Sequence, residues 1–139
     1  MLGRILAIDP GGRRVGLALT DPMRIIASPY ETLLVNDTDD AIKQIIEVIE
    51  KESVTELVVG IPLRPGEALS EQAKRVQTFI EALSAKVTQP VHTVDESYSS
   101  VEAEDSLHQM GKKVGKDKGA VDRIAAAIIL KQYLKEIQH

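Results

Sequence analysis

The chain has 139 residues, of which 43% are hydrophobic and 27% charged, with no cysteine and a formal net charge of −4 at pH 7. These values fit a single folded domain over residues 1–139 and exclude disulfides, thiolate metal sites and a cysteine nucleophile. Without a strongly basic balance, a signal region or an apolar run of membrane-spanning length, we expect a cytoplasmic protein with no membrane segment, in which nucleic-acid binding needs a local basic patch.

The first part of the chain contains two short apolar runs separated by a Pro-Gly-Gly turn. Arg4–Asp9 and Val15–Thr20 are predicted to be antiparallel strands of a hairpin. Asp9 ends the first strand, and the glycines after it let a ligand approach its carboxylate without a bulky neighbour. A carboxylate in this position suits a divalent metal or a metal-bound polyphosphate. The alternative is an aspartate that merely opens the turn.

Periodic patterns define the elements that follow. A third strand is predicted over Arg24–Ala27 and Tyr30–Val35, broken at Pro29. Isoleucines at i, i+3, i+4 and i+7 from Ile42 predict an amphipathic helix. Glu56–Ile61 lacks polar alternation, which is typical of a strand covered on both faces. The remaining predicted elements are a loop over 62–66, a helix from Leu69 capped by Ser70, a strand over Val91–Asp95, a helix over 101–109, a loop over 111–119 and a helix over about 120–137.

This order of elements predicts an α/β fold with a mixed five-stranded sheet and helices on both faces. Short turns make the first three strands antiparallel, whereas helical crossovers make the later strands parallel to the first. Ligands of such sheets bind at the carboxyl ends of the parallel strands. Asp9, Asp95 and Glu96 fall at that edge, and Asp122, near the start of the last helix, could pack over it.

Converging carboxylates at one sheet edge have a chemical use. They can hold one or two Mg²⁺ ions that activate a water and stabilise the leaving oxygen during phosphodiester hydrolysis. Any single acid here, Asp122 above all, can instead be a simple helix or turn cap. The prediction therefore depends on distant acids meeting at one place.

Basic residues lie beside the same predicted edge. Arg13 and Arg14 occupy the first turn, and Arg64 follows another strand. A glycine-bounded loop before the last helix carries Lys112, Lys113, Lys116 and Lys118. These side chains could contact a nucleic-acid backbone, although a lysine loop of this kind is commonly just solvated.

Four segments together carry a family resemblance: Ile8–Asp21, Val59–Leu63 with Gly66, Val94–Ser100, and Asp122–Ala127 with Ile129-Leu130 and Tyr133-Leu134. In this combination the sequence resembles the YqgF/RuvX family of Holliday-junction-resolvase-like proteins and pre-16S rRNA nucleases, over nearly the whole chain. The resemblance implies an RNase H-like fold and a Mg²⁺- or Mn²⁺-dependent endonuclease that cuts structured RNA or branched DNA. It implies maturation of the 16S rRNA 5′ end or, by analogy with RuvC resolvases, junction processing. The sequence leaves a monomer or a homodimer open, and symmetric cutting of a junction would require the dimer.

The resemblance also implies roles for the acids. Asp9 matches the central metal ligand, Asp122 the ligand on the last helix, and Glu96 the third ligand. Asp95 competes with Glu96, because successive strand residues point to opposite faces and only one of the two should face the metal. This chain has Ser97 where the family usually has arginine, which removes a possible phosphate contact.

Two further functions stay open from the sequence. The Ser97 departure favours a non-catalytic nucleic-acid or ribosome-associated module that keeps the fold. An ATP-binding fold of the actin and sugar-kinase type also begins with an Asp-x-Gly hairpin. However, this chain is short for that two-domain fold and lacks a second phosphate-binding hairpin.

Overall fold

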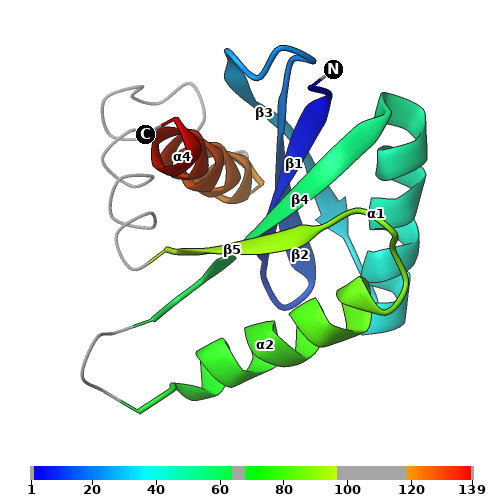
Figure 1. Ribbon diagram of the computed structural model, residues 1–139. Coiled ribbons are helices and arrows are strands. Elements are labelled where there is room, and N and C mark those ends of the chain that lie inside the picture. Colours follow the sequence, from blue (N-terminus) through cyan, green and yellow to red (C-terminus); the bar gives the residue numbers. More distant parts are fainter. Residues whose placement is uncertain (1, 64–67, 97–118, 139) are drawn as a thin grey trace.

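The computed structural model of the protein describes residues 2–63, 68–96 and 119–138 (Figure 1). Arg64, the predicted helix over 101–109 and all four lysines of the predicted loop lie outside these described residues. In the described ranges, no helix combines the length and the apolar character needed to cross a bilayer.

Five strands form one mixed sheet in the order β3-β2-β1-β4-β5. The first three strands pair antiparallel, whereas β4 runs parallel to β1 and β5 parallel to β4. This is the topology predicted from the sequence, and it brings the carboxyl ends of β1, β4 and β5 to one edge. The strands are β1 (Arg4–Pro10), β2 (Arg14–Thr20), β3 (Ala27–Leu34), β4 (Val54–Ile61) and β5 (Val91–Asp95).

Helices cover both faces of the sheet (Figure 1). Helices α1 (Thr38–Glu52) and α2 (Glu71–Ser84) lie on one face, and α4 (Ala120–Ile137) lies on the other. Two of these helices begin at side-chain caps, because Asp37 accepts the N–H of Asp40 and the predicted cap Ser70 accepts the N–H of Ala73.

Strand β1 separates two hydrophobic clusters. Leu6 and Ile8 pack with α1 and α2, whereas Ile5 and Ala7 pack with α4, and all four are fully buried. Because side chains alternate along a strand, Asp9 continues the row of Ile5 and Ala7 and faces α4. The apolar strand β4 is buried on both sides in the same way, which confirms the interpretation of its sequence.

Strand β3 differs from its prediction. The carboxylate of Asp21 accepts three backbone N–H groups between residues 23 and 26, which holds this segment in a loop. Within that loop Arg24 has a positive φ of 60°, so no strand forms at Arg24–Ile26. The strand then runs from Ala27 to Leu34, and its pairing with β2 shifts register between Pro29 and Glu31. The proline is tolerated because β3 is an edge strand, where its missing N–H needs no partner.

Candidate functional site

Asp9 lies in a row of residues that crosses the sheet at its carboxyl edge. Its partner on β2 is Gly16, and the register of β1 with β4 continues from Ile8–Val59 to place Gly60 on its other side. Residues opposite each other in a sheet point to the same face. The Asp9 carboxylate therefore has no neighbouring side chain on either adjacent strand, and space is open on both sides of it.

Glu96 occupies the space on the β4 side. It follows β5, its backbone N–H donates to the carbonyl of Ile61 at 3.0 Å, and only 8% of the residue is exposed. A Cβ atom on Gly60 would overlap Ile129 Cδ1 and lie 3.0 Å from Glu96 Oε2, so the glycine provides room for both side chains.

One proton links Glu96 to Asp9. Burial, followed by the negative charge of Asp9, raises the pKa of Glu96 to about 9. At neutral pH the protonated Glu96 therefore donates a hydrogen bond to the Asp9 carboxylate. The pKa of Asp9 is also raised, mainly by burial and further by the charge of Asp122, against the effect of the hydrogen bond from Glu96.

Asp122 occupies the space on the β2 side. A Cβ atom on Gly16 would overlap the main-chain carbonyl of Asp122 and lie 2.9 Å from its Cβ. The absence of a side chain at Gly16 thus lets the first turn of α4 rest against the strand. Burial raises the pKa of Asp122, and the charges of Arg14 and Arg123 oppose that increase.

Arg14 forms an ion pair with this aspartate, with 3.2 Å between its Nε and Asp122 Oδ2. Asp122 Oδ2 is nevertheless buried and has no hydrogen-bond partner among the described residues. The two atoms are close enough for an ion pair but are not aligned for a hydrogen bond. A buried carboxylate oxygen in this condition has capacity for a further ligand.

Asp95 turns to the other face of the sheet. Val94 packs in the α4 cluster, so alternation directs residues 94 and 96 towards α4 and residue 95 away from it. The Asp95 carboxylate accepts the N–H of Leu63 at 3.2 Å, at the end of β4. The structure thus brings Asp9, Glu96 and Asp122 together and separates Asp95 from them.

The predicted basic residues have different positions. Arg14 is engaged with Asp122, as described above, and its side chain is 43% exposed. Arg13 is exposed at the β1–β2 turn, where its carbonyl accepts the N–H of Val35 at 2.9 Å. Arg64 and the four lysines are outside the described residues, so their predicted contacts stay predictions.

The acids do not already form a metal cage. As they stand, the His, Asp and Glu side chains of residues 2–63, 68–96 and 119–138 provide no group of three that could hold a metal ion. Asp9 and Glu96 share a proton, and Asp122 is held by Arg14.

Sequence reasoning missed the two glycines that shape the site. Gly16 and Gly60 interrupt the apolar runs Val-Gly-Leu and Val-Gly-Ile in the interiors of strands. A glycine inside a strand commonly marks a close approach of another group. That signal could have identified both positions before the structure was known.

This topology and its row of acids define an RNase H-like α/β protein, and solved structures share the fold. Thermus thermophilus RuvC in complex with a Holliday junction substrate matches with a TM-score of 0.61 and 13% identity, over 97% of this chain and 96% of that chain. The fowlpox virus resolvase in complex with Holliday junction DNA matches with a TM-score of 0.61 and 8% identity, over 98% of this chain and 99% of that chain.

The chain belongs to the RuvX family, described as Holliday junction resolvase, whose model matches residues 3–136. A relative from Chloroflexus aurantiacus is 40% identical over 94% of this chain and 85% of its own length. A relative from Roseiflexus sp. is 38% identical over 95% of this chain and 94% of its own length. Both are named "Putative pre-16S rRNA nuclease". These findings confirm the fold and the family predicted from the sequence and place the chain among nucleases.

Proposed function

We propose that this protein is a Mg²⁺- or Mn²⁺-dependent endonuclease, formed by the single domain 1–139, that cuts phosphodiester bonds in structured RNA. One observation carries the proposal. Carboxyl groups from β1, the end of β5 and the start of α4 come together at one edge of the sheet, where Gly16 and Gly60 let Asp122 and Glu96 approach Asp9. Such a gathering of one buried and two half-buried acids destabilises a protein unless a ligand uses it.

The donor set of this site fits a hard divalent cation. Three carboxyl groups are the oxygen ligands that Mg²⁺ and Mn²⁺ prefer. The buried Oδ2 of Asp122 has no hydrogen-bond partner in the described part of the chain, and it faces the side of the sheet that holds Asp9. Glu96 would be able to hold the metal after losing the proton that it shares with Asp9. We therefore assign the metal to Asp9, Glu96 and Asp122 and leave Asp95 outside the set.

A bound metal supplies Lewis-acid activation of water and neutralises the charge that develops on the scissile phosphate. The chain's own residues prepare the site for this role. Asp9 is fixed by the strand register, and the two glycines let Asp122 and Glu96 approach it. Arg14 forms an ion pair with Asp122, and its half-exposed guanidinium would be available to a substrate phosphate if Asp122 held the metal.

The substrate proposed first is precursor 16S rRNA, because that RNA is in the names of the relatives. Four-way junction DNA is the second candidate, and it is supported by the description of the RuvX family. Symmetric cutting of a junction requires two active sites related by a two-fold axis, whereas cutting of RNA does not. Arg13, Arg64 and the lysines at 112, 113, 116 and 118 are proposed to contact the backbone in either case.

The test compares two single substitutions with matched chemistry. Asp9→Asn should reduce cleavage of a precursor rRNA fragment in Mn²⁺ by at least about 100-fold, because the metal contributes several kcal/mol to the transition state. Asp95→Asn is the control, because it changes an aspartate on the opposite face and keeps the oxygen that accepts from Leu63. Cleavage by Asp95→Asn should stay within about threefold of the wild type. A four-way DNA junction assayed in parallel decides between the two substrates.

The non-catalytic module predicts different results. Ser97 in place of the family arginine supports it. In that case neither substrate is cut by the wild type, and calorimetry with nucleic acid present shows no Mn²⁺ binding that depends on Asp9. Cleavage that survives Asp9→Asn in a correctly folded protein would equally overturn the proposed assignment.

A further inference from the structure

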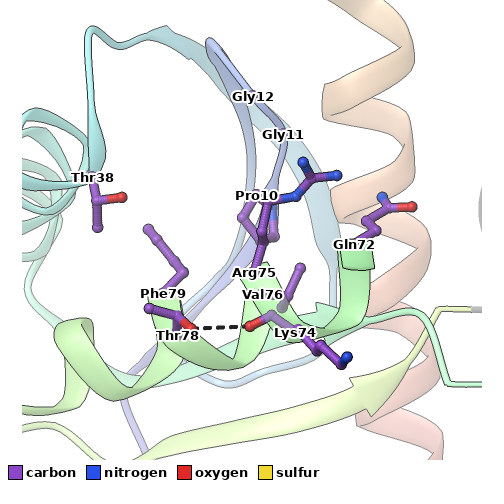
Figure 2. A pocket seen from close by; sticks show the side chains of 10 residues that line it. All are labelled: Pro10, Gly11, Gly12, Thr38, Gln72, Lys74, Arg75, Val76, Thr78 and Phe79. Carbon is purple, nitrogen blue, oxygen red and sulfur yellow. Dashed lines mark hydrogen bonds between the residues drawn. The ribbon is translucent and has the colours of Figure 1, made fainter. Parts of the chain in front are cut away.

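A cleft lies on the face of the sheet opposite the acids. Its walls are the β1–β2 turn at Pro10–Gly12, one side of α2, and Thr38 at the start of α1 (Figure 2). Its volume is about 560 Å³, and a smaller extension of about 140 Å³ reaches towards Val35 and Asp37. Pockets that hold small ligands or single residues of a polymer have volumes in this range.

The lining of this cleft is suited to a phosphate joined to an apolar ring. Val76 and Phe79 form an apolar floor, and Gln72, Thr38 and Thr78 bring amide and hydroxyl groups. None of the described residues that line the main cleft is acidic, although the chain as a whole has a net charge of −4. The carboxylate in the smaller extension, Asp37, already accepts the N–H of Asp40 at 2.8 Å.

Arg75 provides the positive charge of the cleft. Its side chain is exposed, and Figure 2 shows its guanidinium extending beside Pro10. It forms no hydrogen bond or ion pair with the residues that the structure describes. The neighbouring Lys74 differs, because its ammonium lies 3.6 Å from Glu71 and points away from the turn. A cation held at a cleft without a carboxylate partner favours an anionic ligand.

The cleft and the acids share one structural part. Asp9 ends the buried part of β1 with its carboxylate on the α4 side, and Pro10 and Gly11, which follow it directly, line the cleft on the other side. Glycine at positions 11 and 12 keeps this turn thin, and a Cβ atom added to Gly12 would meet nothing within 4 Å. A polymer that crosses the turn can therefore contact both faces.

We propose that this cleft binds one nucleotide unit of the nucleic-acid strand that the acids cut, with its phosphate on Arg75 and its nucleoside over Val76 and Phe79. The inference rests on the proposed function for the identity of the polymer. The cleft thus sets which nucleotide near the scissile bond the protein holds, and it contributes to affinity rather than to the chemical step.

Binding of a labelled RNA hairpin with a single-stranded extension tests this inference. The full chain is used in EDTA, so that no cleavage occurs, and affinity is measured by fluorescence anisotropy across a salt series. Arg75→Ala should weaken binding by about tenfold, the effect of one lost charge-assisted hydrogen bond. It should also reduce the slope of log affinity against log salt by about 0.7, the contribution of one phosphate contact to a single strand.

Two further variants control for charge and folding. Lys86→Ala removes an equal charge from an exposed residue just beyond the far end of α2, and it should change affinity by less than about twofold. Arg75→Lys should recover part of the affinity and the whole salt slope, because it keeps the charge but not the planar fork. Equal affinities of Arg75→Ala and Lys86→Ala would overturn the proposal.

A free nucleotide distinguishes a strand-binding cleft from a small-molecule site. Uridine monophosphate should compete with the RNA only weakly, because one unit lacks the contacts of the rest of the strand. If uridine monophosphate binds tightly through Arg75 while the affinity for RNA does not depend on Arg75, the proposal that the cleft binds a nucleic-acid strand is wrong. Conversely, RNA binding that depends on Arg75, in a protein that cleaves no substrate, would support binding by the cleft. It would show that the proposed nuclease activity is wrong.

Discussion

At the scale of single residues, the state of the site is set by one proton. Glu96 is buried and Asp9 is half-buried beside it, and two neighbouring carboxylates in this setting cannot both be charged without a cation. The protein without metal resolves this conflict by keeping Glu96 protonated. Metal binding must then release a proton, so that affinity for Mn²⁺ should rise with pH.

The shared proton predicts how stability depends on pH without metal. The pKa of Glu96 is about 9 in the folded chain and near its ordinary value of 4.5 in the unfolded chain. Between these values the folded state holds a proton that the unfolded state has lost, so stability falls as pH rises through this window. Glu96→Gln should flatten the dependence and raise unfolding free energy at about pH 8 by about 1–3 kcal/mol.

Calorimetry in EDTA from about pH 5 to about pH 8.5 measures this effect. Glu47→Gln, on the exposed surface of α1, is the control and should behave as the wild type. A wild-type melting temperature that is level across this range would show that Glu96 is not protonated in the fold. The Glu96→Gln variant should also lose cleavage in Mn²⁺, because an amide is a poor replacement for a charged ligand.

The position of this site could be predicted from the sequence, but the choice of its third acid and its protonation could not. Asp9 and Asp122 were identifiable because strand ends and helix starts converge at one edge of a parallel sheet. The choice between Asp95 and Glu96 depended on which face of β5 meets α4, and only the packing of Val94 decides that face. The proton on Glu96 is likewise a result of tertiary burial.

At the scale of elements, the glycines decide how closely strands and helix can approach. Gly16 lets the first turn of α4 rest on β2, and Gly60 leaves room for Glu96 between β4 and α4. Both are interior strand positions, where glycine weakens the strand itself. In the proposed function this cost has a use, because Gly16 lets Asp122 and Gly60 lets Glu96 approach Asp9.

Alanine at these glycines should therefore impair the site in two different ways. Gly16→Ala meets backbone, which cannot give way, and should lower unfolding free energy by about 1–3 kcal/mol together with activity. Gly60→Ala meets the flexible end of Ile129 and the carboxyl group of Glu96, and should reduce cleavage with a smaller loss of stability. Chemical denaturation and cleavage assays measure the two effects separately.

Gly12→Ala is the stability control for this pair, because its Cβ atom meets open space. Its unfolding free energy should lie within about 0.5 kcal/mol of the wild type. If Gly60→Ala kept full cleavage, Glu96 could not be held where the glycine leaves room for it.

The third strand shows why the bounds of some elements could not be predicted from the sequence. Proline predicted a break at Pro29, but an edge strand needs hydrogen bonds on one side only, and edge position is a property of the whole sheet. The start of the strand was misjudged for a local reason. The Asp21 carboxylate captures three N–H groups and keeps the apolar residues at 25 and 26 in a loop.

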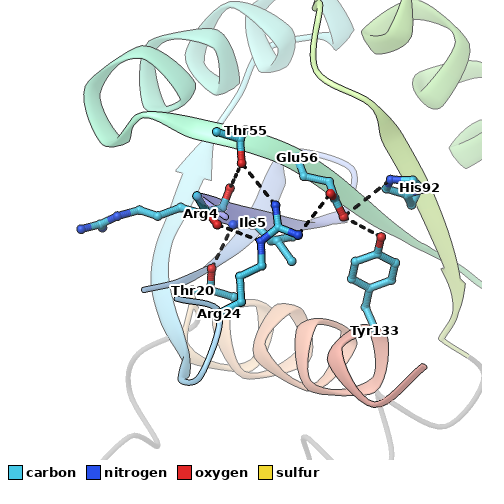
Figure 3. A network of polar contacts seen from close by, with 9 residues as sticks. Arg4, Ile5, Thr20, Arg24, Thr55, Glu56, His92 and Tyr133 are labelled. Atoms are coloured by element: carbon cyan, nitrogen blue, oxygen red, sulfur yellow. Dashed lines mark hydrogen bonds and ion pairs between the residues drawn. The ribbon is translucent and has the colours of Figure 1, made fainter. Parts of the chain in front are cut away.

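At the scale of the whole molecule, the acids at the two ends of the sheet have different surroundings. The carboxyl edge gathers Asp9, Glu96 and Asp122 with few partners. At the opposite end, Glu56 is enclosed by a full set of partners (Figure 3). It accepts from Tyr133 Oη at 2.6 Å and lies 3.4 Å from Arg24 Nη1 and 3.6 Å from His92 Nε2. The first arrangement suits a ligand and the second suits stability.

This contrast predicts that stability and activity can be separated by substitutions at opposite ends. Tyr133→Phe removes a short hydrogen bond to a charged group, and burial together with this bond already raises the pKa of the Tyr133 phenol. The change should lower unfolding free energy by about 1–2 kcal/mol. The turnover rate of the folded enzyme in Mn²⁺ should stay unchanged, because Tyr133 lies at the end of α4 away from Asp122.

Tyr30→Phe is the matched control. The Tyr30 phenol donates to Glu52 at 2.9 Å, and its removal should have a smaller effect on stability. A fall in turnover in step with the loss of stability for Tyr133→Phe would show that α4 transmits changes along its length to the acids, and that the two ends do not act independently.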